Sequence, residues 1–98
     1  MTPEQKKLNL LGLAQRAGAL ITGDEMVEKA IKSGKKVLVV AANDLSPATS
    51  SRYEHLQTTF GLDMDRTFDS YAISQALGKK RSICAINNSG MIKTYLSY

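Results

Sequence analysis

The stretch that decides the fold is TGDEMVEKAIKSGKKVLVVAA, residues 22–42. Its first half predicts a helix from about Asp24 to Ser33 that ends at Gly34. Its second half, Val37–Ala42, is a continuous apolar run, which is typical of a central strand covered on both faces. The residues expected on the inward face of the helix are Val27, Ala30 and Ile31. The stretch therefore predicts a helix that packs against a buried strand of a sheet.

Capping residues and apolar spacing predict further elements on both sides of this stretch. Residues 3–17 form a helix capped by Thr2, residues 19–22 are extended, and a helix capped by Ser46 begins at Pro47 and ends at Gly61. Residues 63–68 are predicted to form a more exposed strand, and residues 70–77 a helix capped by Asp69 or Ser70. Residues 82–87 are predicted to form the last strand, and the residues after Asn88 a final helix. The side chains expected to point inward from these helices include Tyr53, Leu56, Phe60, Ile73 and Leu77, and the final helix carries Met91, Ile92, Tyr95 and Leu96. This alternation predicts an α/β fold, a three-layer α/β/α sandwich with a four-stranded mixed sheet, as a single domain over residues 1–98.

Composition narrows the class of protein. The chain has 98 residues, of which 43% are hydrophobic, enough for one globular domain with its own core. Its net charge of +4 and pI near 9.3 favour a polyanionic partner. The single cysteine, Cys84, lies in an apolar segment, so we expect no internal disulfide and a reducing compartment. No signal peptide or apolar run of roughly 18 residues is found, so a cytoplasmic protein without membrane contact is expected.

Residues that carry enzymatic chemistry are sparse and scattered. The only histidine, His55, lies within a predicted helix and not beside a nucleophile or a cluster of metal ligands. Cys84 is expected to be buried, and strand alternation places Asp63 and Asp65 toward solvent. No G-x-G-x-x-G motif occurs, and Asp24-Glu25 stands where a phosphate-binding loop would carry Lys-Ser or Lys-Thr. The sequence therefore predicts no enzyme, no catalytic residue, no metal ion and no cofactor.

A basic surface is expected along the helix at residues 24–33. Lys29 and Lys32 are three residues apart and share one side of this helix, and Lys35 continues the line past its end. The loop at Gly23 leaves N–H groups of the first helical turn free for phosphate or base edges, and residues 22–25 resemble a capping box that begins at Thr22. Ordinary solvated lysines with ion pairs along the helix explain the same spacing equally well.

A second candidate surface is the turn Asp69-Ser70-Tyr71. An exposed Tyr71 would stack on an unpaired base, an interaction worth roughly 1–3 kcal/mol. Periodicity alone favours the alternative, in which Tyr71 packs against the start of the following helix. The basic segment Lys79-Lys80-Arg81 is interpreted as an ordinary charged turn.

The order and spacing of several segments resemble those of a known family. These segments are LLGLAQRAG at 10–18, GDE at 23–25, KAI at 29–31, Gly34, the apolar run 37–42 with Asp44 and Pro47, and ALG at 76–78. They are similar to the ribosomal protein L7Ae family of kink-turn RNA-binding proteins, particularly its small bacterial members, over nearly the whole chain. The resemblance implies an α/β/α sandwich without enzymatic activity. Its implied ligand is the kink-turn, a sharply bent RNA element with sheared G·A pairs.

The resemblance also implies where RNA binds. In the family, a Gly-x-Asn-Glu-x-x-Lys motif at the start of the second helix enters the bent groove of the RNA. Gly23 and Lys29 match this motif, whereas Glu25 and Met26 stand where Asn and Glu are expected. Glu25 accepts hydrogen bonds but donates none, and Met26 offers essentially no hydrogen bonding, so phosphate attraction and shape remain as the main contributions. The second RNA-contacting loop of the family corresponds to residues 69–71.

The sequence thus predicts a non-enzymatic protein that binds structured RNA, ribosomal or from another kink-turn-containing ribonucleoprotein. The expected RNA-binding residues are Arg16, Gly23, Asp24, Glu25, Met26, Lys29, Lys32, Lys35, Asp69, Ser70 and Tyr71. The alternative is a protein-interaction module on the same scaffold with reduced RNA specificity, in which Met26 is an exposed apolar anchor. A continuous positive stripe from Arg16 to Lys36 would favour RNA.

Overall fold

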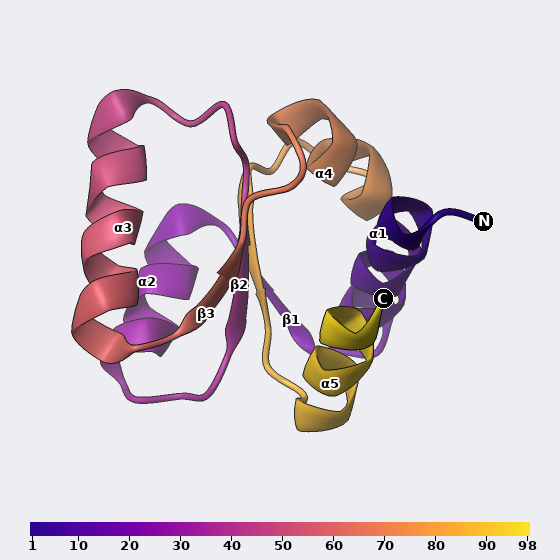
Figure 1. The fold of residues 1–98 in the computed structure, drawn as a ribbon, viewed down its shortest axis with the longest axis horizontal. Helices are drawn as coiled ribbons and strands as arrows, with labels where there is room; N and C mark the ends of the chain where they lie inside the picture. Colours follow the sequence, from indigo (N-terminus) through magenta and orange to yellow (C-terminus); the bar gives the residue numbers. More distant parts are fainter.

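Five helices and four strands alternate along the chain in the computed structural model, which describes residues 1–98 (Figure 1). The helices are α1 (Pro3–Arg16), α2 (Asp24–Lys32), α3 (Pro47–Phe60), α4 (Ser70–Leu77) and α5 (Ser89–Ser97). The strands are β1 (Leu20–Thr22), β2 (Leu38–Ala41), β3 (Asp63–Asp65) and β4 (Ile83–Ile86). Every predicted element is present, although β3 ends at Asp65 instead of Phe68. None of the helices combines the length and the apolar character that crossing a bilayer requires.

The strands form one mixed sheet in the order β1-β4-β2-β3. Strand β4 is antiparallel to both β1 and β2, and β3 is parallel to β2, so β4 alone runs opposite to the others. The register places Cys84 of β4 between Thr22 of β1 and Val40 of β2. Because β1, β2 and β3 run in the same direction and each leads into a helix, α2, α3 and α4 begin at one end of the sheet, the upper end in Figure 1.

Helices cover both faces of the sheet. Figure 1 shows α2 and α3 on one face and α1, α4 and α5 on the other. All residues of β2 and β4 are buried, as expected for central strands between two helical layers. The core on the α2–α3 side includes Val27, Ile31, Val39, Tyr53 and Leu56, and the core on the other side includes Leu11, Leu38, Ile73, Cys84 and Tyr95. Burial raises the pKa of the Cys84 thiol to about 12 and keeps it protonated. The fold is the predicted α/β/α sandwich, a single domain.

Side chains cap four of the five helices at their starts, and these caps explain why the helix boundaries were predictable. The N-cap residues whose side chains accept a hydrogen bond from the backbone N–H three residues ahead are Thr2, Ser46, Asp69 and Asn88. The N-cap of α2 is Gly23, and no side chain caps this helix. The predicted capping box at Thr22 is therefore wrong, because Thr22 is the last residue of β1 and pairs with Cys84 in the sheet.

Two further side chains differ from their predictions. Phe60 is 45% exposed instead of buried, since it is the last residue of α3, where fewer neighbours cover it. Asp65 does not face solvent: its carboxylate accepts a 2.6 Å hydrogen bond from the Tyr95 hydroxyl and lies 3.9 Å from the Lys7 ammonium. Asp65 therefore ties β3 to α5 and α1, which cover the same face of the sheet (Figure 1).

Candidate functional site

A groove with a volume of about 810 Å³ opens at the end of the sheet where α2, α3 and α4 begin. Its walls come from the start of α2, the segment between β2 and α3, the start of α4, and the loop between α4 and β4. The lining residues are Gly23, Asp24, Asp44, Leu45, Ser46, Thr49, Ser70, Tyr71, Ser74, Lys80, Arg81, Ser82 and Ile83. Because the N-terminal end of a helix carries a partial positive charge, the meeting of several such ends favours an anionic ligand.

The start of α2 brings backbone donors to this groove. Gly23 has φ 94° and ψ 144°, and its N–H donates to the Ile83 carbonyl oxygen at 3.0 Å, which joins the turn to β4. The Gly23 carbonyl accepts from the Val27 N–H at 3.0 Å. The N–H groups between these two residues precede the first hydrogen bond within the helix, and no side chain caps them. The start of α2 is therefore the only helix start in the protein that lacks a side-chain cap.

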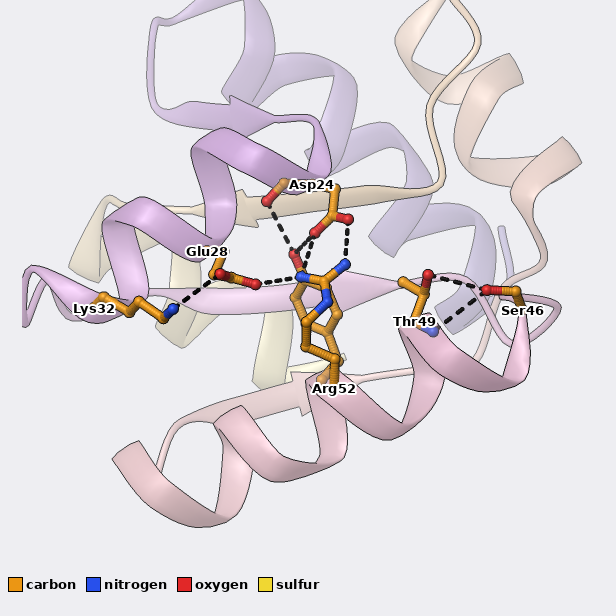
Figure 2. Close-up of polar contacts among 7 residues, drawn as sticks. Asp24, Glu28, Lys32, Ser46, Thr49 and Arg52 are labelled. Carbon is orange, nitrogen blue, oxygen red and sulfur yellow. Dashed lines mark hydrogen bonds and ion pairs between the residues drawn. The ribbon is translucent and has the colours of Figure 1, made fainter.

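The carboxylates of Asp24 and Glu28 are held by α3 (Figure 2). Arg52 Nη1 donates to Asp24 Oδ1 at 2.9 Å, and the same guanidinium pairs with the second Asp24 oxygen and with Glu28. The Tyr53 hydroxyl donates to Asp24 Oδ1 at 2.7 Å, and Lys32 Nζ lies 3.0 Å from Glu28 Oε2. The hydrogen bond from Arg52 lowers the pKa of Asp24, and those from Lys32 and Arg52 lower the pKa of Glu28. Although Asp24 lines the groove, its carboxylate is thus engaged within the protein.

This network predicts a loss of stability in acid. The folded pKa values of Asp24 and Glu28 lie below their ordinary values of 3.8 and 4.5. The ionised carboxylates therefore stabilise the folded protein above these ordinary pKa values, and this stabilisation is lost as the pH falls through the lowered pKa values. Solvent screening limits the contribution of Asp24 to about 1 kcal/mol. We expect Asp24→Asn to be less stable than the wild-type protein at neutral pH and nearly equal to it well below pH 3.8, as measured by urea unfolding.

The matched control for this measurement is Asp63→Asn, because Asp63 is exposed on β3, away from the network. Its free energy of unfolding should stay close to that of the wild-type protein at both pH values. An Asp24→Asn variant that is equally destabilised in acid and at neutral pH would show that its defect does not come from the lost ion pair.

The start of α4 is fastened to the segment that leads into α3. Asp44 accepts from both the N–H and the hydroxyl of Ser70, each at 2.9 Å, and the hydroxyl hydrogen bond lowers the pKa of Asp44. The Asp69 carboxylate accepts from the Ala72 N–H at 2.8 Å as the N-cap of α4. The side chains of Asp69 and Ser70 are therefore engaged within the protein. Tyr71 is 71% exposed and lines the groove, so it does not pack away against α4.

The loop between α4 and β4 brings two cationic side chains, Lys80 and Arg81, to the groove. Neither is among the RNA-binding residues predicted from the sequence. The Ser74 hydroxyl accepts from the Arg81 N–H at 3.0 Å and donates to the Arg81 carbonyl at 2.9 Å, which holds the loop to α4. Lys80 and Arg81 both line the groove, and neither forms an ion pair with a carboxylate. Nothing in the sequence signals this role, because only the sheet order places the start of β4 beside the ends of β1 and β2.

Four predicted RNA-binding residues of α2 lie outside the groove lining. Glu25, Met26 and Lys29 are exposed on the helix surface, and no ion pair joins Glu25 to Lys29. Lys32 is exposed and paired with Glu28. Of the α2 segment, the structure therefore places only its start, Gly23 and Asp24, in the groove.

Two further predicted residues occupy separate depressions. Lys35 lies at the far end of α2, in a depression that it shares with Phe60 and Gly61. Arg16 lines a depression between α1 and α4 that shares Tyr71 with the groove. The basic residues from Arg16 to Lys36 therefore do not line one common groove. No group of three or more His, Cys, Asp or Glu side chains in the structure is placed to hold a metal ion.

Sequence comparison identifies relatives along most of the chain. Residues 5–95 match the model of the ribosomal protein L7Ae/L30e/S12e/Gadd45 family. The chain is 36% identical to the RNA-binding protein YlxQ of Enterococcus faecium, over 91% of this chain and 86% of that protein. It is 25% identical to the RNA-binding protein YlxQ of Bacillus subtilis strain 168, over 90% of this chain and 89% of that protein.

Solved structures share the fold. A protein of unknown function from Bacillus halodurans C superposes with a TM-score of 0.86 at 28% identity, and the match covers 94% of each chain. The 15.5kD RNA binding protein of Giardia lamblia superposes with a TM-score of 0.80 over 97% of this chain and 82% of that one, and its 17% identity shows the fold alone. On the family match over nearly its whole length, the chain belongs to the ribosomal protein L7Ae/L30e/S12e/Gadd45 family.

Proposed function

We propose that this protein binds folded RNA of the kink-turn type, without enzymatic activity, through the groove at the start of α2. The observation that carries the proposal is the meeting of the uncapped start of α2 with Lys80, Arg81 and the exposed Tyr71 in one groove. Membership of the L7Ae/L30e/S12e/Gadd45 family and 36% identity to an RNA-binding protein support an RNA ligand. The proposed partner is ribosomal RNA or another RNA that contains a kink-turn.

Each part of the groove suits a different part of such an RNA. Free N–H groups at the start of α2 donate to phosphate oxygens or base edges. Lys80 and Arg81 neutralise phosphates, and the planar guanidinium of arginine offers a phosphate two parallel donors. Tyr71 stacks on a base that is unpaired at the bend. Arg16, in the depression next to Tyr71, and Lys29 on α2 are proposed phosphate contacts beyond the groove.

Compared with the Gly-x-Asn-Glu-x-x-Lys motif of the family, α2 of this chain offers fewer side-chain groups for base-specific contacts. Glu25 has no donor for guanine O6 or N7, and Met26 has neither a donor nor a strong acceptor. Each lost base contact costs on the order of 1–3 kcal/mol of discrimination. We therefore propose that the shape of the bent RNA and attraction to its phosphates carry most of the recognition.

One observation favours a second candidate function, a protein-interaction module on the same scaffold. Met26 is 56% exposed on α2, as an apolar anchor for a protein partner would be. The groove, with its two cations that lack carboxylate partners, supports RNA more strongly than it supports an apolar contact.

A titration of the purified protein distinguishes these functions. The two ligands are a kink-turn RNA and a control RNA that lacks the G·A pairs, each at two salt concentrations. We expect about tenfold tighter binding to the kink-turn and weaker binding of both RNAs as salt rises. Equal affinity for the two RNAs would retain RNA binding and reject kink-turn recognition. Binding to neither would reject the proposal and favour the protein-interaction module.

A further inference from the structure

Arg52 of α3 joins two carboxylates of α2 in a network that gives every carboxylate oxygen a partner (Figure 2). Asp24 receives two guanidinium nitrogens and the Tyr53 hydroxyl, and Glu28 receives Arg52 on one oxygen and Lys32 on the other. The Arg52 guanidinium carbon lies 5.2 Å from the centroid of the Tyr53 ring, a cation–π contact that holds it in place. The planar fork of an arginine suits this pattern, because its two terminal nitrogens reach different carboxylate oxygens at once, whereas the three donors of a lysine share one nitrogen.

The network balances the charge of α2. The helix carries three acids, Asp24, Glu25 and Glu28, against Lys29 and Lys32, so its own charge is 2 − 3 = −1. Acids in the first turn suit the helix dipole but repel an approaching phosphate. The α3 arginine supplies the missing positive charge, and it does so from outside the groove, in the depression between α2 and α3.

We propose that Arg52 is a positioning residue for RNA binding: it holds Asp24 and Glu28 against α3 and, together with Lys32, neutralises them, so that the first turn of α2 accepts a phosphate. This inference rests on the proposed RNA-binding function. Arg52 acts through the two carboxylates and does not contact RNA. Without it, Asp24 keeps only the Tyr53 hydroxyl as a partner, and its uncompensated negative charge in the lining of the groove repels the RNA backbone.

The test compares three variants of the full chain at one low salt concentration: Arg52→Met, Asp24→Asn/Glu28→Gln, and the triple variant. Methionine removes the charge of Arg52, and the amides keep the shape of the carboxylates. We expect Arg52→Met to bind a kink-turn RNA about tenfold more weakly. The triple variant should recover to within about threefold of the wild-type affinity, because the anions that required Arg52 are gone. The control for losing one positive charge is Lys93→Met, an exposed position on α5.

The outcomes separate this inference from the proposed function. Failure of the wild-type protein to bind RNA rejects the proposed function. Wild-type RNA affinity in Arg52→Met overturns the positioning role. A loss of RNA affinity in Arg52→Met that the triple variant does not recover also overturns it, and indicates direct contact of Arg52 with RNA. If Arg52→Met does not fold, as judged by a thermal melt, the RNA affinity of the Asp24→Asn/Glu28→Gln variant tests the positioning role instead. The positioning role predicts an affinity for this double variant within about threefold of wild type, and a loss of about tenfold or more contradicts it.

Discussion

Gly23→Ala is expected to lower the free energy of unfolding by about 1–3 kcal/mol, although the added methyl group would meet no atom within 4 Å beyond the two residues next to it in the chain. The cost arises in the backbone alone. At φ 94° and ψ 144°, Gly23 occupies a region that side chains exclude, because a Cβ atom there clashes with the adjoining peptide groups. An alanine therefore leaves the turn between β1 and α2 strained or forces it to rebuild, and urea unfolding measures the difference.

The same substitution should weaken RNA binding by the folded protein about tenfold, because a rebuilt turn moves the N–H groups at the start of α2. Gly34→Ala is the matched control, since Gly34 also has a positive φ, 82°, and open space around it, but lies beyond the other end of α2. This control should cost stability without weakening RNA binding. Equal losses of RNA affinity in the two variants would contradict a role for the start of α2.

The sequence predicted the elements of this fold because each is specified locally. Ser46 before Pro47, and Gly61 in the left-handed conformation after α3, show how a few adjacent residues define a helix. The same kind of local pattern gave a wrong prediction at Thr22. Threonine often caps helices, but Thr22 pairs with β4 in the sheet instead. The pairing partner is 62 residues away in the sequence, at Cys84, so no local pattern reveals it.

The candidate site was only partly predictable for the same reason. Spacing and resemblance singled out Gly23 and Tyr71, and the groove contains both. The pairing of Asp24 with Arg52 joins residues that are 28 positions apart, and helical periodicity cannot specify such a contact. Lys80 and Arg81 looked like an ordinary charged turn because their place in the groove lining depends on the order of the strands, which the alternation of helices and strands leaves open.

The double variant Lys80→Ala/Arg81→Ala is expected to weaken RNA binding by about 10- to 100-fold. Both residues line the groove, and neither forms an ion pair with a carboxylate, so each is available to neutralise a phosphate. Each lost phosphate contact should also make the dependence of log affinity on log salt shallower by about 0.7 to 0.9. Anisotropy titrations at several salt concentrations measure both effects. The loop should keep its place, because Ser74 bonds to the backbone of Arg81, which alanine retains.

Lys35→Ala/Lys36→Ala is the matched control, because it removes the same charge from the far end of α2. With nine residues, this helix is roughly 13 Å long, a distance over which salt screens exposed charges. If the groove is the interface, the control should lose less than about threefold in affinity and keep most of its salt dependence. If the lysines along α2 form the interface, the order of the two variants reverses. Since both variants have the same net charge, only the location of the RNA can produce the difference between them.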